Sequence, residues 1–150
     1  MNPLILNIPA IDANYAKRIK LGRLPRLQTD KMSPWGRKHH HDFWHKRVVE
    51  AVLEAGGAPG EPLRAAEIVG IRYCAGTPPD RINVWASFKC LVDALQAPGR
   101  RPKDCKIGAS VIVDDSPVTL VSEDYYSVRV ATRAEERITL SIRDRDPAQP

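Results

Sequence analysis

The hydrophobic pattern of this chain changes its period across a pair of prolines, and this change constrains the fold more than any other feature. Residues 66–75 have the apolar and polar alternation of a β-strand. Residues 82–96 repeat apolar side chains every three or four positions, which predicts an α-helix. Because proline has no backbone N–H and a fixed φ, Pro78 and Pro79 end the strand. The chain therefore places a strand directly before a helix, with Asp80 at the junction.

The remaining segments continue this order of strand and helix. A short apolar run at residues 4–8 predicts a first strand, and residues 37–55 form a helical pattern that ends at two glycines. Two alternating segments, residues 126–130 and 138–142, predict a hairpin. This order indicates an α+β fold, with a small mixed β-sheet and two main helices packed on one face.

The length of 150 residues predicts a single domain that spans residues 1–150. Its hydrophobic content of 43% and charged content of 27% are those of a soluble globular protein. Residues 10–36 are interrupted by prolines and glycines and are expected to form a long basic loop. Residues 144–150 are expected to form a flexible tail.

The sequence contains no apolar run long enough to span a membrane. Its first nine residues lack the basic and then apolar layout of a signal peptide, so we expect a cytoplasmic protein without a membrane partner. Cys74, Cys90 and Cys105 are odd in number and lack the spacing of a metal site. We expect them to be reduced thiols.

The net charge of +5 is concentrated in the first third of the chain. Residues 1–50 contain ten Lys or Arg against four Asp or Glu, and the rest of the chain is close to balance. A basic segment attracts phosphate backbones, although a mildly basic protein need not bind nucleic acid. The candidate DNA contacts lie in the basic loop and near residue 100: Lys17, Arg18, Lys20, Arg23, Arg26, Arg100, Arg101, Lys103 and Lys106.

Acidic residues stand at the ends of two expected elements, and a lysine lies between them in the sequence. Asp80 precedes the second helix, and Asp114 and Asp115 follow a short apolar run. Lys89 and Asp93 lie one turn apart on that helix. Mg²⁺ is usually bound by one or two carboxylates together with water and phosphate oxygens. A lysine beside such a site would stabilise negative charge on a phosphate.

Each of these residues also has an ordinary structural interpretation. Asp80 is well placed to cap the helix, because its carboxylate can accept from free backbone N–H groups. Residues 114–117 have the composition of a turn. Lys89 and Asp93 have the spacing of a solvent-exposed ion pair. Only their occurrence together, in this order, favours a nuclease site.

In this order the residues resemble the RusA family of Holliday junction resolvases. The family pattern is Asp-x-Asp-Asn, then a helix with Lys-x-x-x-Asp-x-Leu, then Asp-Asp a couple of dozen residues later. The resemblance covers residues 4–143 and is specific only between residues 80 and 117. The second aspartate of the opening motif is Ile82 in this chain. The matched positions are Asp80, Asn83, Lys89, Asp93, Leu95, Asp114 and Asp115.

The resemblance implies an endodeoxyribonuclease that resolves Holliday junctions and other branched DNA in recombination and repair. The cofactor would be Mg²⁺, with Mn²⁺ as a substitute. A homodimer is implied, because two nicks on strands related by two-fold symmetry require two matching sites. A phage or prophage origin in a bacterial host cell is also implied.

The resemblance further implies a role for each matched residue. Asp80, Lys89 and Asp115 would be catalytic, with Lys89 stabilising charge at the scissile phosphate. Asn83 would position the loop at Asp80 or a water molecule, and Asp93 would orient Lys89. The metal would be bound by carboxylates at the ends of elements: Asp80, Asp114 and Asp115.

Ile82 removes one expected carboxylate from the site and leaves three outcomes open. A neighbouring carboxylate replaces it, from Asp114, Glu123 or Asp124; or the site binds one metal ion in place of two; or the chain binds branched DNA without cutting it. A further alternative is a small interaction protein with no nucleic-acid role, in which the charge pattern is coincidental.

Four histidines in the expected first helix introduce a zinc alternative. His41 and His45 lie one turn apart, a spacing that can bind zinc, but the segment lacks the HExxH arrangement and an evident third ligand. Contact with DNA phosphates is the favoured role. Trp35, Trp44 and Trp85 are candidates to stack on exposed bases, although core packing is favoured for Trp44 and Trp85.

Overall fold

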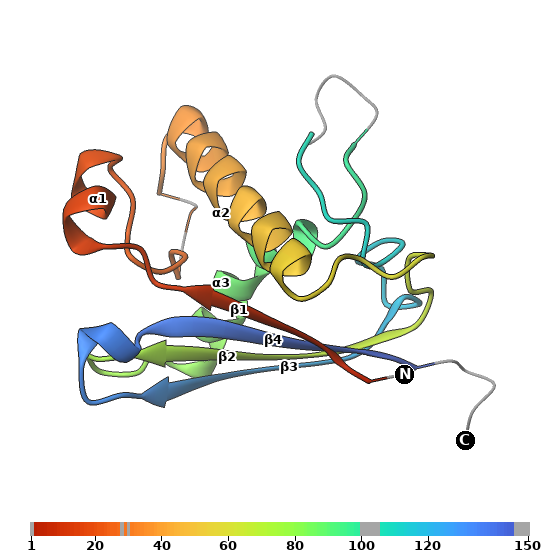
Figure 1. The fold of residues 1–150 in the computed structure, drawn as a ribbon. Coiled ribbons are helices and arrows are strands. Elements are labelled where there is room, and N and C mark those ends of the chain that lie inside the picture. Colours follow the sequence, from red (N-terminus) through yellow and green to blue (C-terminus); the bar gives the residue numbers. More distant parts are fainter. Residues whose placement is uncertain (1, 28, 30, 100–105, 146–150) are drawn as a thin grey trace.

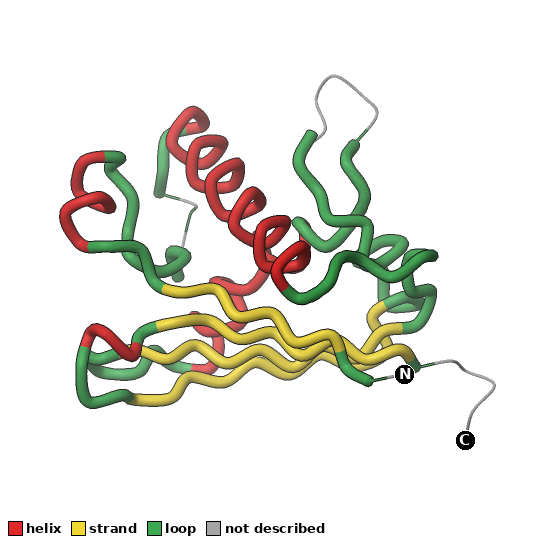
Figure 2. The backbone as a smooth tube through the Cα atoms, in the orientation of Figure 1, coloured by secondary structure: helices red, strands yellow, loops and turns green. Residues whose placement is uncertain are grey.

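The computed structural model describes residues 2–27, 29, 31–99 and 106–145. Its centre is a mixed sheet of four strands in the order β1-β4-β2-β3 (Figures 1 and 2). The α+β prediction is confirmed. The strands are β1 (Leu4–Pro9), β2 (Ala66–Cys74), β3 (Leu120–Arg129) and β4 (Arg137–Asp144). The helices are α1 (Ala13–Arg18), α2 (Pro34–Glu54), α3 (Arg81–Asp93) and a short 3₁₀ turn, η1 (Arg133–Glu135).

The predicted hairpin between the last two strands is wrong. β2 lies between β3 and β4, so that Gly70 is opposite Tyr125 on one side and Leu140 on the other. β2 and β3 are parallel, whereas β4 is antiparallel to both β1 and β2. Parallel strands need a crossover connection, and α3 with the segment after it supplies that crossover. Residues 138–142 lie within β4, as predicted, whereas β3 begins six residues before the predicted strand at 126–130, and Tyr126 and Val128 are on its exposed face. Side-chain alternation does not identify the neighbour with which a strand pairs.

The helices α2 and α3 both pack on the face of the sheet that carries Leu6 and Leu140. Trp44 of α2 and Phe88 of α3 are fully buried in the same core as these two leucines. At Gly70 the two layers meet so closely that a Cβ atom would lie 2.5 Å from Cε1 of Phe88. The expectation of two main helices on one face agrees with this arrangement (Figure 1).

The segment between β1 and α2 is more regular than expected. Residues 13–18 form α1, which begins where the Asp12 carboxylate accepts hydrogen bonds of 3.0 Å from the N–H groups of Asn14 and Tyr15. α2 begins at Pro34, three residues before the predicted start. Proline is favoured in the first turn of a helix, because the N–H that it lacks would have no helical partner there. The basic loop is therefore shorter than residues 10–36.

The C-terminal end of the sheet extends beyond the predicted strand. β4 continues to Asp144, and the Arg145 side chain donates to the Glu67 carboxylate over 2.6 Å. Residues 144 and 145 are therefore not part of a flexible tail, and residues 146–150 lie outside the described part of the chain.

Candidate functional site

A small cleft lies between α3 and the first half of β3. Its volume is about 190 Å³. Charged residues from three separate segments reach it: Lys89 from α3, Asp115 from the connection that precedes β3, and Glu123 from β3 itself. The rings of Trp85 and Tyr125 form apolar parts of its wall. Thus three carboxylate or ammonium groups that are distant in sequence meet at one place.

Lys89 is the centre of the charged network in this cleft. Its ammonium group donates to Asp93 over 2.7 Å and also to Asp115. Partial burial acts to lower the pKa of Lys89, but the hydrogen bonds to Asp115 and Asp93 outweigh it and raise that pKa. The hydrogen bond from Lys89 lowers the pKa of Asp115. The lysine is therefore cationic and Asp115 anionic at neutral pH.

The apolar run before Asp115 fixes its position. Val111 and Ile112 are fully buried, and both of their N–H groups donate to the Leu95 carbonyl just after α3, over 2.7 and 3.2 Å. On the other side, Val113 donates to the Leu63 carbonyl over 3.0 Å. The run forms only a single bridge, between Ile112 and Leu63, rather than a full strand. This anchoring brings the residues that follow it against the α3 surface.

Asp114 differs from Asp115 although the two are adjacent. Its carboxylate accepts a hydrogen bond of 3.0 Å from the Ser116 N–H. Hydrogen bonds from the Ser116 and Thr119 side chains lower the pKa of Asp114. The turn that was proposed as the ordinary interpretation of this segment is therefore present, and it engages Asp114, whereas Asp115 is engaged by Lys89.

Asp80 caps α3, as its ordinary interpretation predicted. Its carboxylate accepts from the backbone N–H of Asn83 over 2.9 Å and from the Asn83 side-chain amide over 3.0 Å. Asn83 therefore does hold the Asp80 side chain. Nine residues separate Asp80 from Lys89, which is a rise of about 13 Å along a helix. The structure thus brings together Lys89, Asp93 and Asp115, and places Asp80 at the far end of the same helix.

Glu123 is the one neighbour, of the three considered as replacements for the missing carboxylate, that lines the cleft with Lys89 and Asp115. The Tyr125 hydroxyl donates to its carboxylate over 2.6 Å. Asp124 lies on the opposite face of β3, beside Val69 in the register. From the sequence, strand alternation predicts that Glu123 and Asp124 point to opposite faces of the sheet. Which of the two points toward α3 depends on the pairing of β3 with β2.

Ile82 is 82% exposed at the start of α3. It lies three residues before Trp85 and seven before Lys89, so all three share one helical face. A carboxylate at position 82 would therefore project along the same side of α3 as the cleft. The exposed Ile82 leaves this part of the face without a charge and is not part of the core.

The predicted DNA contacts have different environments. Lys17, Arg18 and Lys20 are exposed on or just after α1. Arg23 is tied to other parts of the chain and is described below, and Arg26 is exposed. The Lys106 ammonium donates to the Gly99 carbonyl over 2.9 Å. Arg100, Arg101 and Lys103 lie outside the described residues.

The histidines of α2 have structural partners. His40 is fully buried and its Nε2 accepts from the Arg26 N–H over 3.0 Å. A ring nitrogen of His45 lies 3.1 Å from the Ile107 carbonyl. Within the described residues no three His, Cys, Asp or Glu side chains are grouped so as to hold a metal ion. Trp44 is buried in the core, as favoured, whereas Trp35 is 75% exposed.

No family model matches this chain, and no curated protein matches it. In the part of the chain that the structure describes, no helix has the length and apolar character needed to cross a membrane. The functional interpretation therefore rests on the residues and their arrangement.

Proposed function

We propose that this protein is a Mg²⁺-dependent endodeoxyribonuclease of the RusA type, which resolves four-way junctions and other branched DNA. The proposal includes a homodimer that acts in the cytoplasm of a bacterial host, as the product of a phage or prophage. The observation that carries it is the meeting of Lys89 with Asp93 and Asp115. These are three of the motif residues. Lys89 and Asp93 lie on α3, whereas Asp115 lies in the connection before β3, which is anchored by backbone hydrogen bonds to Leu95 and Leu63.

The carboxylates of the cleft suit a hard divalent cation. Asp115 and Glu123 both line it, and one or two carboxylates suffice for Mg²⁺ when water and phosphate oxygens complete its shell. Asp115 and Glu123 would hold the ion, whereas Asp80 caps the far end of α3 and Asp114 is engaged by the turn that follows it. When bound, Mg²⁺ supplies Lewis acidity at the phosphate and lowers the pKa of water.

The side chains around the cleft have separate tasks in this reaction. Lys89, with its raised pKa, remains an ammonium group and stabilises negative charge on the phosphate. Asp93 orients that ammonium group from one helical turn away. The Tyr125 hydroxyl fixes the Glu123 carboxylate, and the Trp85 ring packs edge-on against Tyr125 at a centroid distance of 4.7 Å. The exposed basic residues of α1 attract the DNA backbone.

A second candidate is a protein of the same fold that binds branched DNA without cutting it. Ile82 favours it, because the α3 face that would carry another carboxylate is apolar and exposed. This candidate differs from the first only in chemistry, so the two share every prediction about DNA binding.

The experiment that separates them is cleavage of a labelled synthetic four-way junction beside a linear duplex of the same sequence. The purified protein is incubated with Mg²⁺, with Mn²⁺ or with EDTA. Paired symmetric nicks that require metal and spare the duplex establish the nuclease. Tight junction binding without nicks in either metal establishes the second candidate. Binding to neither DNA at moderate salt contradicts both and favours a protein-interaction role.

A further inference from the structure

A second cavity lies at the other end of the sheet and is larger than the candidate cleft. Its volume is about 530 Å³. It is formed where β2 ends, where η1 leads into β4, and where the segment at residues 22–26 crosses them. The short connection from β2 to Asp80 also begins here, since Ala75 and Gly76 line the cavity. This cavity has no role in the proposed chemistry.

The wall of this cavity is unusually rich in arginine. Among the described residues, Arg23, Arg26, Arg72 and Arg133 line it, and Glu136 is the acidic residue that faces them. The formal charges of these five side chains therefore leave an excess of three positive charges. Arginine side chains gathered on one concave surface give it a positive potential that attracts anions.

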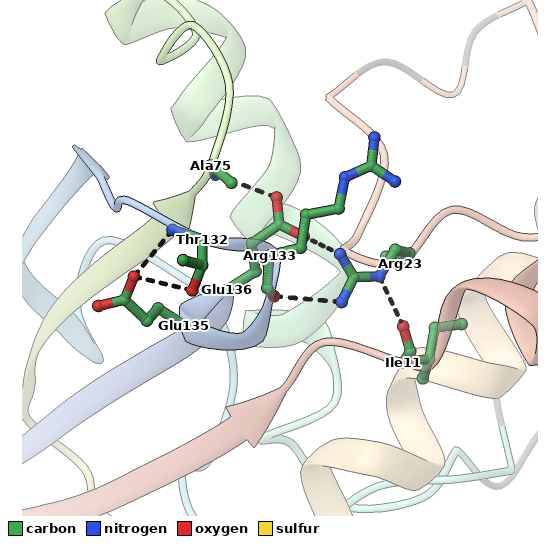
Figure 3. A network of polar contacts seen from close by, with 7 residues as sticks. All are labelled: Ile11, Arg23, Ala75, Thr132, Arg133, Glu135 and Glu136. Carbon is green, nitrogen blue, oxygen red and sulfur yellow. Dashed lines mark hydrogen bonds and ion pairs between the residues drawn. The ribbon is translucent and has the colours of Figure 1, made fainter.

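One arginine and the glutamate form the rigid frame of the cavity. Arg23 pairs with Glu136 over 2.5 Å and donates to the carbonyls of Ile11 and Arg133 over 3.0 and 3.2 Å. The other oxygen of Glu136 accepts from the Ala75 N–H over 3.0 Å. These contacts join β2, η1 and the crossing segment (Figure 3). Arg23 is consequently used within the protein rather than held out toward solvent.

The other three arginines have no such neutralising partner. Within the described residues, none of Arg26, Arg72 and Arg133 forms an ion pair. In Figure 3 the Arg133 guanidinium extends away from the frame without a marked contact. Its backbone is fixed by η1, whose first turn is closed by reciprocal contacts between Thr132 and Glu135. The charge excess is therefore built into the fold.

Arg72 is the arginine whose surroundings most favour the binding of an anion. It lies on the helix-covered face of β2, where its Nη1 donates to the Pro25 carbonyl over 2.5 Å. Its Nε is buried and has no hydrogen-bond partner among the described residues. Burial lowers the pKa of Arg72, and the nearby Glu136 only partly opposes this effect. A half-buried cation that forms no ion pair has lost part of its hydration, and a bound anion would offset that loss.

We infer that this cavity binds a phosphate group through Arg26, Arg72 and Arg133. Guanidinium groups match phosphate oxygens with paired hydrogen bonds, and three of them around one site favour an anion with several oxygen acceptors, such as a phosphate group, over a monatomic anion. Leu24, Pro25 and Ala75 supply an apolar wall that a sugar attached to the phosphate would contact. The source of the phosphate is a backbone group of the bound DNA strand, and this assignment of the source rests on the proposed function.

The test measures DNA binding and phosphate binding separately, in EDTA, so that cleavage does not enter. Anisotropy of a labelled four-way junction gives the affinity of the parent, of Arg26→Ala/Arg133→Ala and of the control Arg64→Ala. Arg64 is exposed and carries the same charge but lies before β2, away from the cavity. Melting temperatures with inorganic phosphate or a 5′-mononucleotide, against chloride at equal ionic strength, report on the free ligands.

The double variant is expected to bind the junction about tenfold or more weakly, since hydrogen bonds to charged groups contribute more than neutral ones. Its salt slope should fall by about one to two, whereas Arg64→Ala should change the affinity less than twofold. Phosphate should raise the melting temperature of the parent and not that of the double variant. Arg72→Lys, which keeps the charge and loses the paired geometry, should reduce the same shift.

Equal losses in the double variant and in Arg64→Ala, with no phosphate-dependent shift in the parent, would overturn the inference. A phosphate or mononucleotide shift that depends on these arginines, with unchanged junction binding, would support the site and overturn DNA as the source. If only the nuclease proposal is wrong, both binding assays give the expected result and the cleavage assay shows no metal-dependent nicks.

Discussion

At the scale of single residues, two adjacent aspartates of the candidate site make different contacts and have different roles. Asp114 accepts from the turn that follows it, and Asp115 accepts from Lys89. An acidic pair after an apolar run therefore supplies one residue that shapes the turn and one that faces the cleft. The two should respond differently to the same substitution.

Replacing Asp115 by Asn is expected to abolish metal-dependent cleavage and to leave junction binding unchanged or stronger, because a negative charge near the phosphates is lost. The matched control is Asp124→Asn, which changes the same charge on the opposite face of β3. Cleavage is measured with Mg²⁺, and binding by anisotropy in EDTA. Cleavage by Asp115→Asn at the parent rate would show that the site is elsewhere.

Replacing Ile82 by Asp tests whether the apolar position limits the metal affinity. The new carboxylate would lie on the same α3 face as Lys89, so the Mg²⁺ concentration for half-maximal cleavage should fall by about tenfold, since ligand charge sets affinity for hard cations. Ile82→Asn has nearly the same size without the charge and should not show this effect. An identical metal dependence in the parent and in both variants would mean that position 82 does not contact the metal.

At the scale of elements, His40 links α2 to the segment that carries Arg26. Burial lowers the pKa of His40 to about 4, helped by the positive neighbours His41 and Arg26. The acceptor for the Arg26 N–H must be an unprotonated ring nitrogen, since a protonated ring has no acceptor. Folding therefore favours the neutral histidine, and the unfolded chain binds the additional proton.

The free energy of unfolding should consequently fall as the pH is lowered from about 6.5 toward 4. Between pH 7 and pH 5 the expected loss from His40 is about 2 kcal/mol, because the unfolded chain protonates at its ordinary pKa and the folded chain does not. Burial also lowers the pKa of His41, which acts in the same direction. Urea unfolding of the parent and of His40→Gln at both pH values isolates the contribution. Equal pH dependence in the two proteins would contradict it.

Gly70 controls the spacing between β2 and the layer of α3. A Cβ atom there would lie 2.5 Å from the Phe88 ring and 2.7 Å from the Tyr125 ring. Gly70→Ala should therefore lower the free energy of unfolding by about 1–3 kcal/mol through overpacking. Gly60 has open space around it, and Gly60→Ala serves as the control that should be close to neutral. A loss in Gly60→Ala as large as in Gly70→Ala would show that packing at this contact is not the cause.

The elements themselves were predictable to different degrees. The period change at Pro78 and Pro79 correctly located β2 and α3, because side-chain spacing is a local property of the sequence. The pairing of β3 was not predictable in this way, since it depends on the crossover through α3. α1 was missed because its start relies on the Asp12 cap and its length is only six residues.

The residues of the candidate site were also predictable to different degrees. The motif order identified Lys89, Asp93 and Asp115, which the fold does bring together. Glu123 was only one of three replacements considered, because selecting it required the face that β3 turns toward α3. Of the arginine cavity, the sequence indicated only Arg23 and Arg26, as parts of the basic loop, since the lining residues come from segments around 22–26, 72–76 and 133–136. Such a charge cluster emerges only when the chain is folded.

At the scale of the whole molecule, the proposed function requires two copies of the site. The described chain presents one cleft with Lys89 and Asp115, and junction resolution takes two nicks on symmetry-related strands. A homodimer whose subunits each nick one strand therefore differs in its products from two monomers that act independently. The difference is measurable without knowledge of the interface.

Co-expression of the parent chain with an excess of Asp115→Asn chain, distinguished by a tag, should yield dimers in which most active subunits have an inactive partner. Such dimers still bind the junction symmetrically but can nick only one strand, so the products should change from resolved duplexes to singly nicked junctions. The control mixes parent with the Asp124→Asn chain, in which both sites remain intact and resolution should persist. Resolved product that merely decreases in proportion to the active chain, with no accumulation of singly nicked junction, would mean that the two cuts are not made by paired subunits.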